Sequence, residues 1–191
     1  VIFAVNSAYK INTNLSLMQC NTNYNGSPEN FKYINLNVLK TYSKLFPKVI
    51  LGLSDHTTGH ATVLGAITLG ARIIEKHFTD DNSREGPDHA FAMNPNSWEE
   101  MVLRSRELQS SLGIDIKKVE ANEKETVILQ RRSIRLTEDK EKGETLSEPD
   151  LIELRPCPED SIPLSKINEI IGKRLKKSIK KGGYLKWEDL I

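Results

Sequence analysis

The stretch VILGLSDHTTGH, residues 49–60, changes abruptly from aliphatic to polar side chains. Similar runs lie on either side of it, LSLMQC at residues 15–20 and RIIEKHF at residues 72–78. Apolar runs of about five residues are typical of strands that are buried on both faces of a sheet. The three runs therefore predict three strands, with polar residues gathered where the strands end.

Helical patterns fill the segments between these runs. Residues 28–45 carry apolar side chains at mostly helical spacing, and Ser27 before them is a predicted N-cap. Residues 60–71 predict a short apolar helix, and residues 94–113 predict an amphipathic helix that stops at Gly113. This alternation predicts a parallel α/β fold, in which chemistry collects at the carboxyl ends of the strands.

The chain changes character after Gly113. Residues 114–126 are charged and lack an apolar face, so they predict a linker between residues 1–113 and a small domain at residues 127–191. The small domain alternates short β-like segments with turn-forming residues, and it contains an internal sequence repeat, called here the echo. KGETL at residues 142–146 recurs as KGGYL at residues 181–185, which predicts a pseudo-symmetric β module near the lower size limit for independent folding.

Composition excludes several classes of function. Basic and acidic residues nearly cancel to a net charge of +1, which argues against a nucleic acid or an anionic membrane as partner. No apolar stretch approaches the roughly 18 residues that span a bilayer. Cys20 and Cys157 predict free thiols in a reducing, cytoplasmic compartment, and they cannot supply a closed structural zinc site. The first residues contain no leader and no initiating Met, so we expect a longer protein.

Histidines follow two of the predicted strands at the same depth. His56 comes after the second run and His77 lies near the end of the third. Two neutral imidazoles at neighbouring strand ends can hold one divalent ion at about 2.1 Å and leave positions for water and substrate. The alternative is that each histidine is hydrogen-bonded scaffolding. Asp88, in the loop at residues 86–89, can bind sugar hydroxyls or an amide, or it can cap a turn.

A longer stretch around these residues is similar to a known family. LGLSDHTTGHATVLGAITLGARIIEKHFTDDNSREGPDHAFAMNP, residues 51–95, resembles the signature half of the sialic acid synthases, the N-acetylneuraminate synthases with their legionaminic and pseudaminic acid relatives. The tail from Arg131, through Arg155-Pro156 to Leu190, resembles the antifreeze-like domain that ends those enzymes. The resemblance implies an α/β fold: the C-terminal βα units of a (β/α)8 TIM barrel, followed by a small β-rich antifreeze-like (SAF) domain. It also implies a domain-swapped homodimer.

The resemblance implies an activity as well. Family members condense phosphoenolpyruvate with an N-acetylated hexosamine, typically N-acetylmannosamine, and release phosphate and a nine-carbon 2-keto sugar acid. His56 and His77 match the ligands of a divalent metal ion, Mn²⁺ first, with Mg²⁺ or Co²⁺ as alternatives, which polarises the sugar aldehyde. Glu75 lies two residues before His77 on the same strand face, so the catalytic candidates are His56, His77 and Glu75.

Substrate-binding roles transfer position by position. Ser54 matches a phosphate-contacting serine, and Tyr24 matches an aromatic residue of the substrate pocket. Asp88 matches a carboxylate that binds the acceptor sugar, and Arg155 matches an arginine that reaches the N-acetyl group from the partner subunit. Thr22 stands where the family often has Asn in the phosphate-binding turn. The stretch NGSP, residues 25–28, also departs from the Pro-Thr-Pro of many members.

Two further readings stay open beside this one. A legionaminic-acid-type synthase would take a deoxy-diacetamido sugar as acceptor, and a non-catalytic fragment would bind a carbohydrate or a protein. The loop GPDH, residues 86–89, argues against a pseudaminic acid synthase, for which we expect a different loop. The family's first five strands, which supply lysines for phosphoenolpyruvate and a catalytic glutamate, have no counterpart in these 191 residues. We therefore expect the isolated chain to be inactive.

Overall fold

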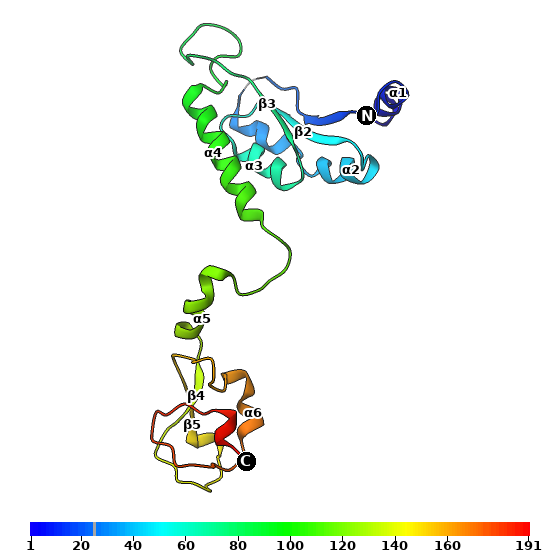
Figure 1. Cartoon of the computed structure of the whole chain (residues 1–191). Helices are drawn as coiled ribbons and strands as arrows, with labels where there is room; N and C mark the ends of the chain where they lie inside the picture. Colours follow the sequence, from blue (N-terminus) through cyan, green and yellow to red (C-terminus); the bar gives the residue numbers. More distant parts are fainter. Residues whose placement is uncertain (25) are drawn as a thin grey trace. The chain divides into compact units, whose positions relative to one another are not determined.

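The computed structural model describes residues 1–24 and 26–191, so Asn25 of the NGSP stretch lies outside the described residues. The chain divides into two compact units, Val1–Asp115 and Ile116–Ile191 (Figure 1). Helix α5 (Lys124–Gln130) begins inside the predicted linker and continues past its predicted end. Within the described part of the chain, no helix has the length and apolar character needed to cross a membrane.

The first unit is built on a parallel sheet of three strands in the order β1-β2-β3. The strands β1 (Ser16–Cys20), β2 (Ile50–Asp55) and β3 (Ile73–Lys76) fall on the three predicted runs. Their register pairs Cys20 with Ser54 and Ser54 with Glu75. The polar residues that follow the three strands therefore meet at one edge of the sheet.

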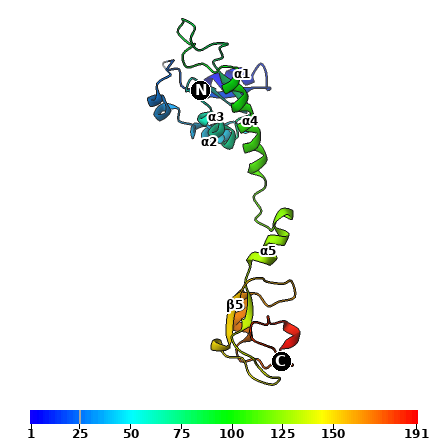
Figure 2. The same cartoon turned by 90° about the vertical axis from the view of Figure 1, so that its left-hand side faces the viewer.

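Two of the predicted helices are confirmed. Helix α3 (Ala61–Thr68) is followed by Gly70 at φ +96°, and α4 (Pro95–Leu112) is followed by Gly113 at φ +53°. Glycine accommodates these positive angles without the steric cost of a Cβ atom. Asn94 caps α4, because its side chain accepts a hydrogen bond from the Ser97 amide. Helices α3 and α4 lie side by side (Figure 1, Figure 2).

The single helix predicted for residues 28–45 is wrong. The segment forms a 3₁₀ helix η1 (Pro28–Tyr33) and a separate α2 (Val38–Leu45). The chain breaks at Asn35, whose φ of 50° an asparagine tolerates better than most residues. The predicted cap at Ser27 is present, since its side chain accepts a hydrogen bond from the Glu29 amide. A further helix, α1 (Ile2–Tyr9), was not predicted.

Helices cover one face of the sheet in the described residues. Leu53 is fully buried and belongs to one apolar cluster with Leu39 of α2 and Ala66 of α3. On the opposite face Ile50 and Ile73 are 50% and 38% exposed. Side chains alternate between the two faces along a strand. The polar residues at the carboxyl edge therefore form two sets, one on each face of the sheet.

The second unit has an internal two-fold symmetry, as its sequence echo predicts. The amide of Gly182 donates to the Leu136 carbonyl at 2.8 Å, and the amide of Gly143 donates to the Leu175 carbonyl at 2.8 Å. In the same way Lys140 exchanges two backbone hydrogen bonds with Ile179. The repeat contains β4 (Ser133–Leu136) and the matching turns η3 (Glu148–Asp150) and η5 (Trp187–Asp189). The other elements of the unit are η2 (Ala121–Glu123), β5 (Leu151–Leu154), η4 (Leu164–Lys166) and α6 (Ile167–Ile170).

The core of this unit is shared by the two halves. Leu146 and Leu185 occupy matching places in the echo and are 1% and 0% exposed in one cluster. Asp150 and Asp189 also match, and each is the last residue of a 3₁₀ turn. Its carboxylate accepts a hydrogen bond from the backbone amide of the residue just before that turn, Ser147 or Lys186. Asp150 is further bound by the Ser147 hydroxyl at 2.6 Å and by Lys140 at 2.9 Å.

We expect Asp150 to make the second unit acid-sensitive. Hydrogen bonds from Ser147, and then from Lys140, lower the pKa of Asp150 from 3.8 to about 2. Because the folded pKa lies below the unfolded one, the stabilisation is complete above about pH 4 and is lost as the pH falls towards 2. It amounts to about 1–2 kcal/mol. In thermal unfolding measured by calorimetry, Asp150→Asn should be less stable at neutral pH and show a flatter profile between pH 4 and 2; an equally steep profile would contradict the assignment.

Candidate active site

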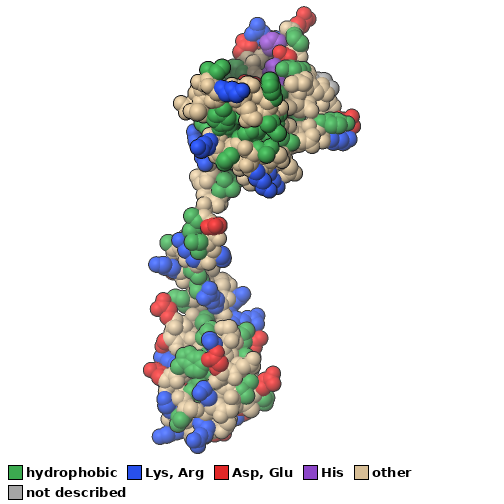
Figure 3. All heavy atoms as spheres, turned by 90° about the vertical axis from the view of Figure 1, so that its right-hand side faces the viewer, with side chains coloured by type: hydrophobic (Ala, Val, Ile, Leu, Met, Phe, Trp, Pro, Cys, Tyr) green, Lys and Arg blue, Asp and Glu red, His purple; other side chains and the backbone are tan. Residues whose placement is uncertain are grey.

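The carboxyl edge of β2 and β3 forms a cavity of about 280 Å³. Its lining consists of two triplets, residues 54–56 and 75–77. Alternation along the strands puts Ser54 and Glu75 on the face away from α3, and Asp55 and Lys76 on the face towards it. The cavity therefore opens on the side of the serine, the glutamate and the two histidines. Histidine side chains gather at this end of the first unit next to acidic ones (Figure 3).

His56 and His77 lie together, as the sequence predicts. Their ring centroids are 5.0 Å apart. His56 Nδ1 is 2.8 Å from the backbone oxygen of Asn21, and His77 Nδ1 is 3.4 Å from Asp88 Oδ2. A carbonyl oxygen only accepts, so Nδ1 of His56 carries the proton and its Nε2 keeps a free lone pair. The Asp88 carboxylate lies beside Nδ1 of His77 but makes no hydrogen bond with it.

These two rings fit a divalent metal ion. Metal-binding histidines usually donate their second ring N–H to a backbone carbonyl or a carboxylate. His56 has such a partner in the Asn21 carbonyl, and His77 has the Asp88 carboxylate 3.4 Å from its Nδ1. The 5.0 Å between centroids lets one nitrogen of each ring approach a common ion at about 2.1 Å. Among the described residues no group of three or more His, Cys, Asp or Glu side chains is placed to hold a metal. The candidate donors among the described residues of this unit are thus the two imidazoles.

Aromatic rings form a wall beside the histidines. The ring of Tyr24 lies 4.1 Å from that of His56 and 5.5 Å from that of His77, while 52% of Tyr24 remains exposed. Phe91 approaches His77 from the other side at 5.3 Å. Tyr24 was predicted and Phe91 was not. A signal existed, because Phe91 follows the predicted GPDH loop by two residues.

Ser54 and Glu75 are joined by a short hydrogen bond. Ser54 Oγ donates to Glu75 Oε1 at 2.7 Å, as expected for residues paired directly across two strands. A serine hydroxyl has one proton, so Ser54 cannot donate to a phosphate while it holds Glu75. The predicted phosphate contact thus requires that the Ser54 hydroxyl turn away from Glu75 or accept a hydrogen bond from a protonated oxygen of the ligand.

The loop that carries Asp88 is ordered by its own side chains. Asn82 Nδ2 donates to the backbone oxygens of His89 at 2.8 Å and Ala92 at 2.9 Å. The hydroxyl of Thr79 contacts His89 Nδ1 at 2.7 Å. Sequence reasoning missed Asn82, although Asn is a common residue for fixing a loop backbone. Asp88 itself is half exposed, with one side towards His77 and the other free for a ligand.

Comparison with known proteins decides the family. Residues 1–117 match the model of the NeuB family, and residues 131–191 match that of the SAF domain. The chain belongs to the NeuB family. It is 39% identical to the N,N'-diacetyllegionaminic acid synthase of Legionella pneumophila over 92% of this chain and 48% of that protein. It is 36% identical to the human N-acetylneuraminate-9-phosphate synthase over 57% of this chain and 30% of that enzyme.

Solved structures agree with this assignment. The spore coat polysaccharide biosynthesis protein SpsE of Bacillus subtilis is 29% identical, with a TM-score of 0.52 over 100% of this chain and 58% of that one. The chain spans about half the length of the curated relatives that it matches. Both parts of the predicted fold, a NeuB α/β unit and a SAF domain, are therefore present in this chain.

The two remaining predicted substrate residues, Thr22 and Arg155, are both exposed. Thr22 is exposed in the loop after β1, where its neighbours Asn21 and Tyr24 contact His56. Arg155 belongs to the SAF unit, where it is exposed and its Nε donates to the Gln130 carbonyl at 2.7 Å. That bond leaves the two terminal nitrogens of the guanidinium group for a ligand.

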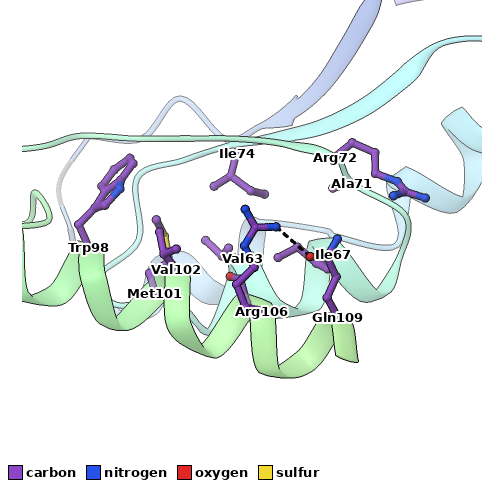
Figure 4. Close-up of a pocket in the computed structure, with 11 residues that line it drawn as sticks. Val63, Ile67, Ala71, Arg72, Ile74, Trp98, Met101, Val102, Arg106 and Gln109 are labelled. Atoms are coloured by element: carbon purple, nitrogen blue, oxygen red, sulfur yellow. Dashed lines mark hydrogen bonds between the residues drawn. The ribbon is translucent and has the colours of Figure 1, made fainter. Parts of the chain in front are cut away.

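A second cavity of the NeuB unit has no catalytic character. It measures about 270 Å³ and lies between α3, α4 and the helix side of β3 (Figure 4). Ile74, Trp98 and Met101 line its apolar part, and Arg106 donates to Gln109 at its end. It lies on the face of the sheet opposite to Ser54 and Glu75.

Asp88→Asn tests the acceptor role of this loop. An amide cannot replace the charge that receives hydrogen bonds from sugar hydroxyls, so we expect the KM for the acceptor to rise about tenfold. The same change weakens the contact with His77, so a smaller loss of metal affinity is expected as well. Steady-state kinetics in the full-length protein, with the acceptor and the metal varied in turn, separate the two effects. An unchanged acceptor KM would remove Asp88 from the sugar site.

Proposed function

We propose that this chain forms the metal-binding and acceptor-binding part of a sialic acid synthase-type enzyme. The reaction joins phosphoenolpyruvate to an N-acetylated hexosamine, N-acetylmannosamine or a similar sugar, and yields a nine-carbon 2-keto sugar acid and phosphate. The observation that carries the proposal is the pair of histidines, whose ring centroids are 5.0 Å apart, with Nδ1 of His56 at the Asn21 carbonyl and Nδ1 of His77 3.4 Å from Asp88. In this proposal β1, β2 and β3 are the last strands of a (β/α)8 barrel.

The side chains divide the work among them. A divalent ion held by His56 and His77, Mn²⁺ or else Mg²⁺ or Co²⁺, would supply Lewis-acid polarisation of the sugar aldehyde. Asp88 binds hydroxyls of the acceptor and places its negative charge beside Nδ1 of His77. Tyr24 and its neighbouring rings restrict water on one side of the site. Glu75 accepts a hydrogen bond from Ser54 and so sets the direction of that hydroxyl.

The SAF domain completes the site from a second subunit. Arg155 is exposed, and its planar guanidinium suits an amide or carboxylate oxygen. We propose that the chain acts as a domain-swapped homodimer, in which Arg155 of one copy reaches the N-acetyl group bound at the other. Domain exchange is a low-cost route to a two-fold dimer.

The test follows phosphate release by the full-length protein. Phosphoenolpyruvate and Mn²⁺ are supplied with N-acetylmannosamine or with a deoxy-diacetamido sugar in parallel reactions. Release that depends on N-acetylmannosamine supports the leading proposal, and release only with the diacetamido sugar supports the legionaminic-type alternative. If no phosphate is released with either sugar although both sugars bind, the protein is a carbohydrate-binding protein and not an enzyme of this type.

A further inference from the structure

A buried ion pair lies directly behind the two histidines. Asp55 and Lys76 are the last residues of β2 and β3 and are paired in the register of the sheet. Their side chains are 0% and 2% exposed, and Lys76 Nζ is 2.6 Å from Asp55 Oδ2. Their side chains point to the α3 side of the sheet, where Asp55 accepts a hydrogen bond from Thr62. Each is followed in the chain by one of the histidines, His56 or His77.

The pair is part of a larger hydrogen-bond network. Asp55 accepts from the hydroxyls of Thr57, at 2.9 Å, and Thr62, at 2.7 Å, and from the Thr57 amide at 3.2 Å. Lys76 Nζ also donates to the Thr57 carbonyl at 2.7 Å. His56 thus stands between two residues that are bound to the same ammonium group. The network joins the ends of both strands to the first turn of α3.

Stability alone does not explain an ion pair at this place. Removing two charges from water costs about as much as their attraction returns, and buried pairs can often be replaced by apolar side chains without loss of stability. What such a network does supply is one fixed arrangement of the backbone around it. Here the network fixes the backbone next to His56 and His77, the two residues whose rings would share an ion.

We propose that Asp55 and Lys76 are positioning residues for the histidine pair. Their bond sets the spacing of His56 and His77, and through it the affinity of the site for a divalent ion. The metal part of this inference rests on the proposed function, but the effect on ring spacing does not. The loss of a residue that orients metal ligands typically lowers metal affinity by about 10–100-fold.

The double variant Asp55→Asn/Lys76→Met removes both charges together, so that neither is left buried without a partner. The matched control is Asp150→Asn/Lys140→Met, which makes the same two substitutions in an ion pair of the SAF domain. Mn²⁺ affinity of the full-length protein is measured from free Mn²⁺ by electron paramagnetic resonance, and folding by circular dichroism. We expect at least a tenfold higher Kd in the first variant and an unchanged Kd in the control. An unchanged Kd in a folded first variant would overturn the proposal.

Two further measurements cover the other outcomes. If the double variant does not fold, Thr62→Val removes one hydroxyl from Asp55 and leaves both charges paired; weaker Mn²⁺ binding supports the proposal and equal binding overturns it. If the wild-type protein binds no Mn²⁺, the metal part of the proposed function fails. Crystal structures of the wild type and the double variant then decide: the 5.0 Å spacing of the rings is altered if the pair positions them, and preserved if it does not.

Discussion

Full-length protein with His56→Ala or His77→Ala is expected to lose about a thousand-fold in metal-dependent turnover. Each substitution removes one of the two imidazoles of the site, and Lewis-acid stabilisation of several kcal/mol corresponds to a loss of this size. The fold should persist, because both side chains lie at the rim of the sheet and belong to none of the apolar clusters. Turnover is measured as phosphate release, and bound Mn²⁺ by equilibrium dialysis.

His60→Ala is the control for this experiment. His60 precedes α3 in the same unit but does not line the cavity between the two strand ends. Its replacement should leave metal binding and turnover near those of the wild type. A His56→Ala protein that kept both its metal and its rate would show that the imidazoles are scaffolding, the alternative that the sequence also allows.

Mixing two inactive proteins tests the exchanged dimer. A His77→Ala subunit and an Arg155→Ala subunit are each expected to be inactive alone. In a mixed dimer, one site combines an intact His77 with the intact Arg155 of the other copy. Random exchange makes half of the dimers mixed, so about a quarter of wild-type activity should return. The measurement is phosphate release after the two proteins have been mixed and allowed to exchange subunits.

The control establishes that exchange takes place. Copies carrying different affinity tags are co-purified from the mixture, and the fraction of mixed dimers is counted. Full exchange without any recovered activity would mean that Arg155 serves the site of its own subunit, or no site. Wild-type protein diluted with an equal amount of either variant provides the reference rate.

The framework of this chain could be predicted because its signals are local. Apolar runs end in polar residues, and Gly70 and Gly113 end helices at positive φ, where glycine costs least. The break at Asn35 could not be predicted in this way. Ile34 and Leu39 lie on either side of the break and are both buried. The helical spacing of apolar residues therefore continues across Asn35, although the helix itself is interrupted there. A spacing pattern reports which side chains face the core, not whether the helix between them is continuous.

The candidate site shows the same division between local and non-local signals. His56 and His77 could be predicted to meet, because equal depth on neighbouring parallel strands is enough. The ion pair of Asp55 and Lys76 was missed, since each charge looks solvent-facing until the register sets one opposite the other. Asn21 was missed for a related reason. Its contact with His56 uses a backbone oxygen, which no side-chain pattern reveals.

The two-fold pattern of the SAF domain has a consequence for how this unit assembles. Because Gly182 donates to Leu136 and Gly143 donates to Leu175, each half supplies the acceptor for an amide of the other. The halves are therefore equivalent to two subunits of a symmetric dimer that have been joined end to end. The connecting residues 151–172 act as a tether, which gives each half a high effective concentration of the other. A cut within the tether would turn a first-order folding reaction into a bimolecular association whose extent depends on protein concentration.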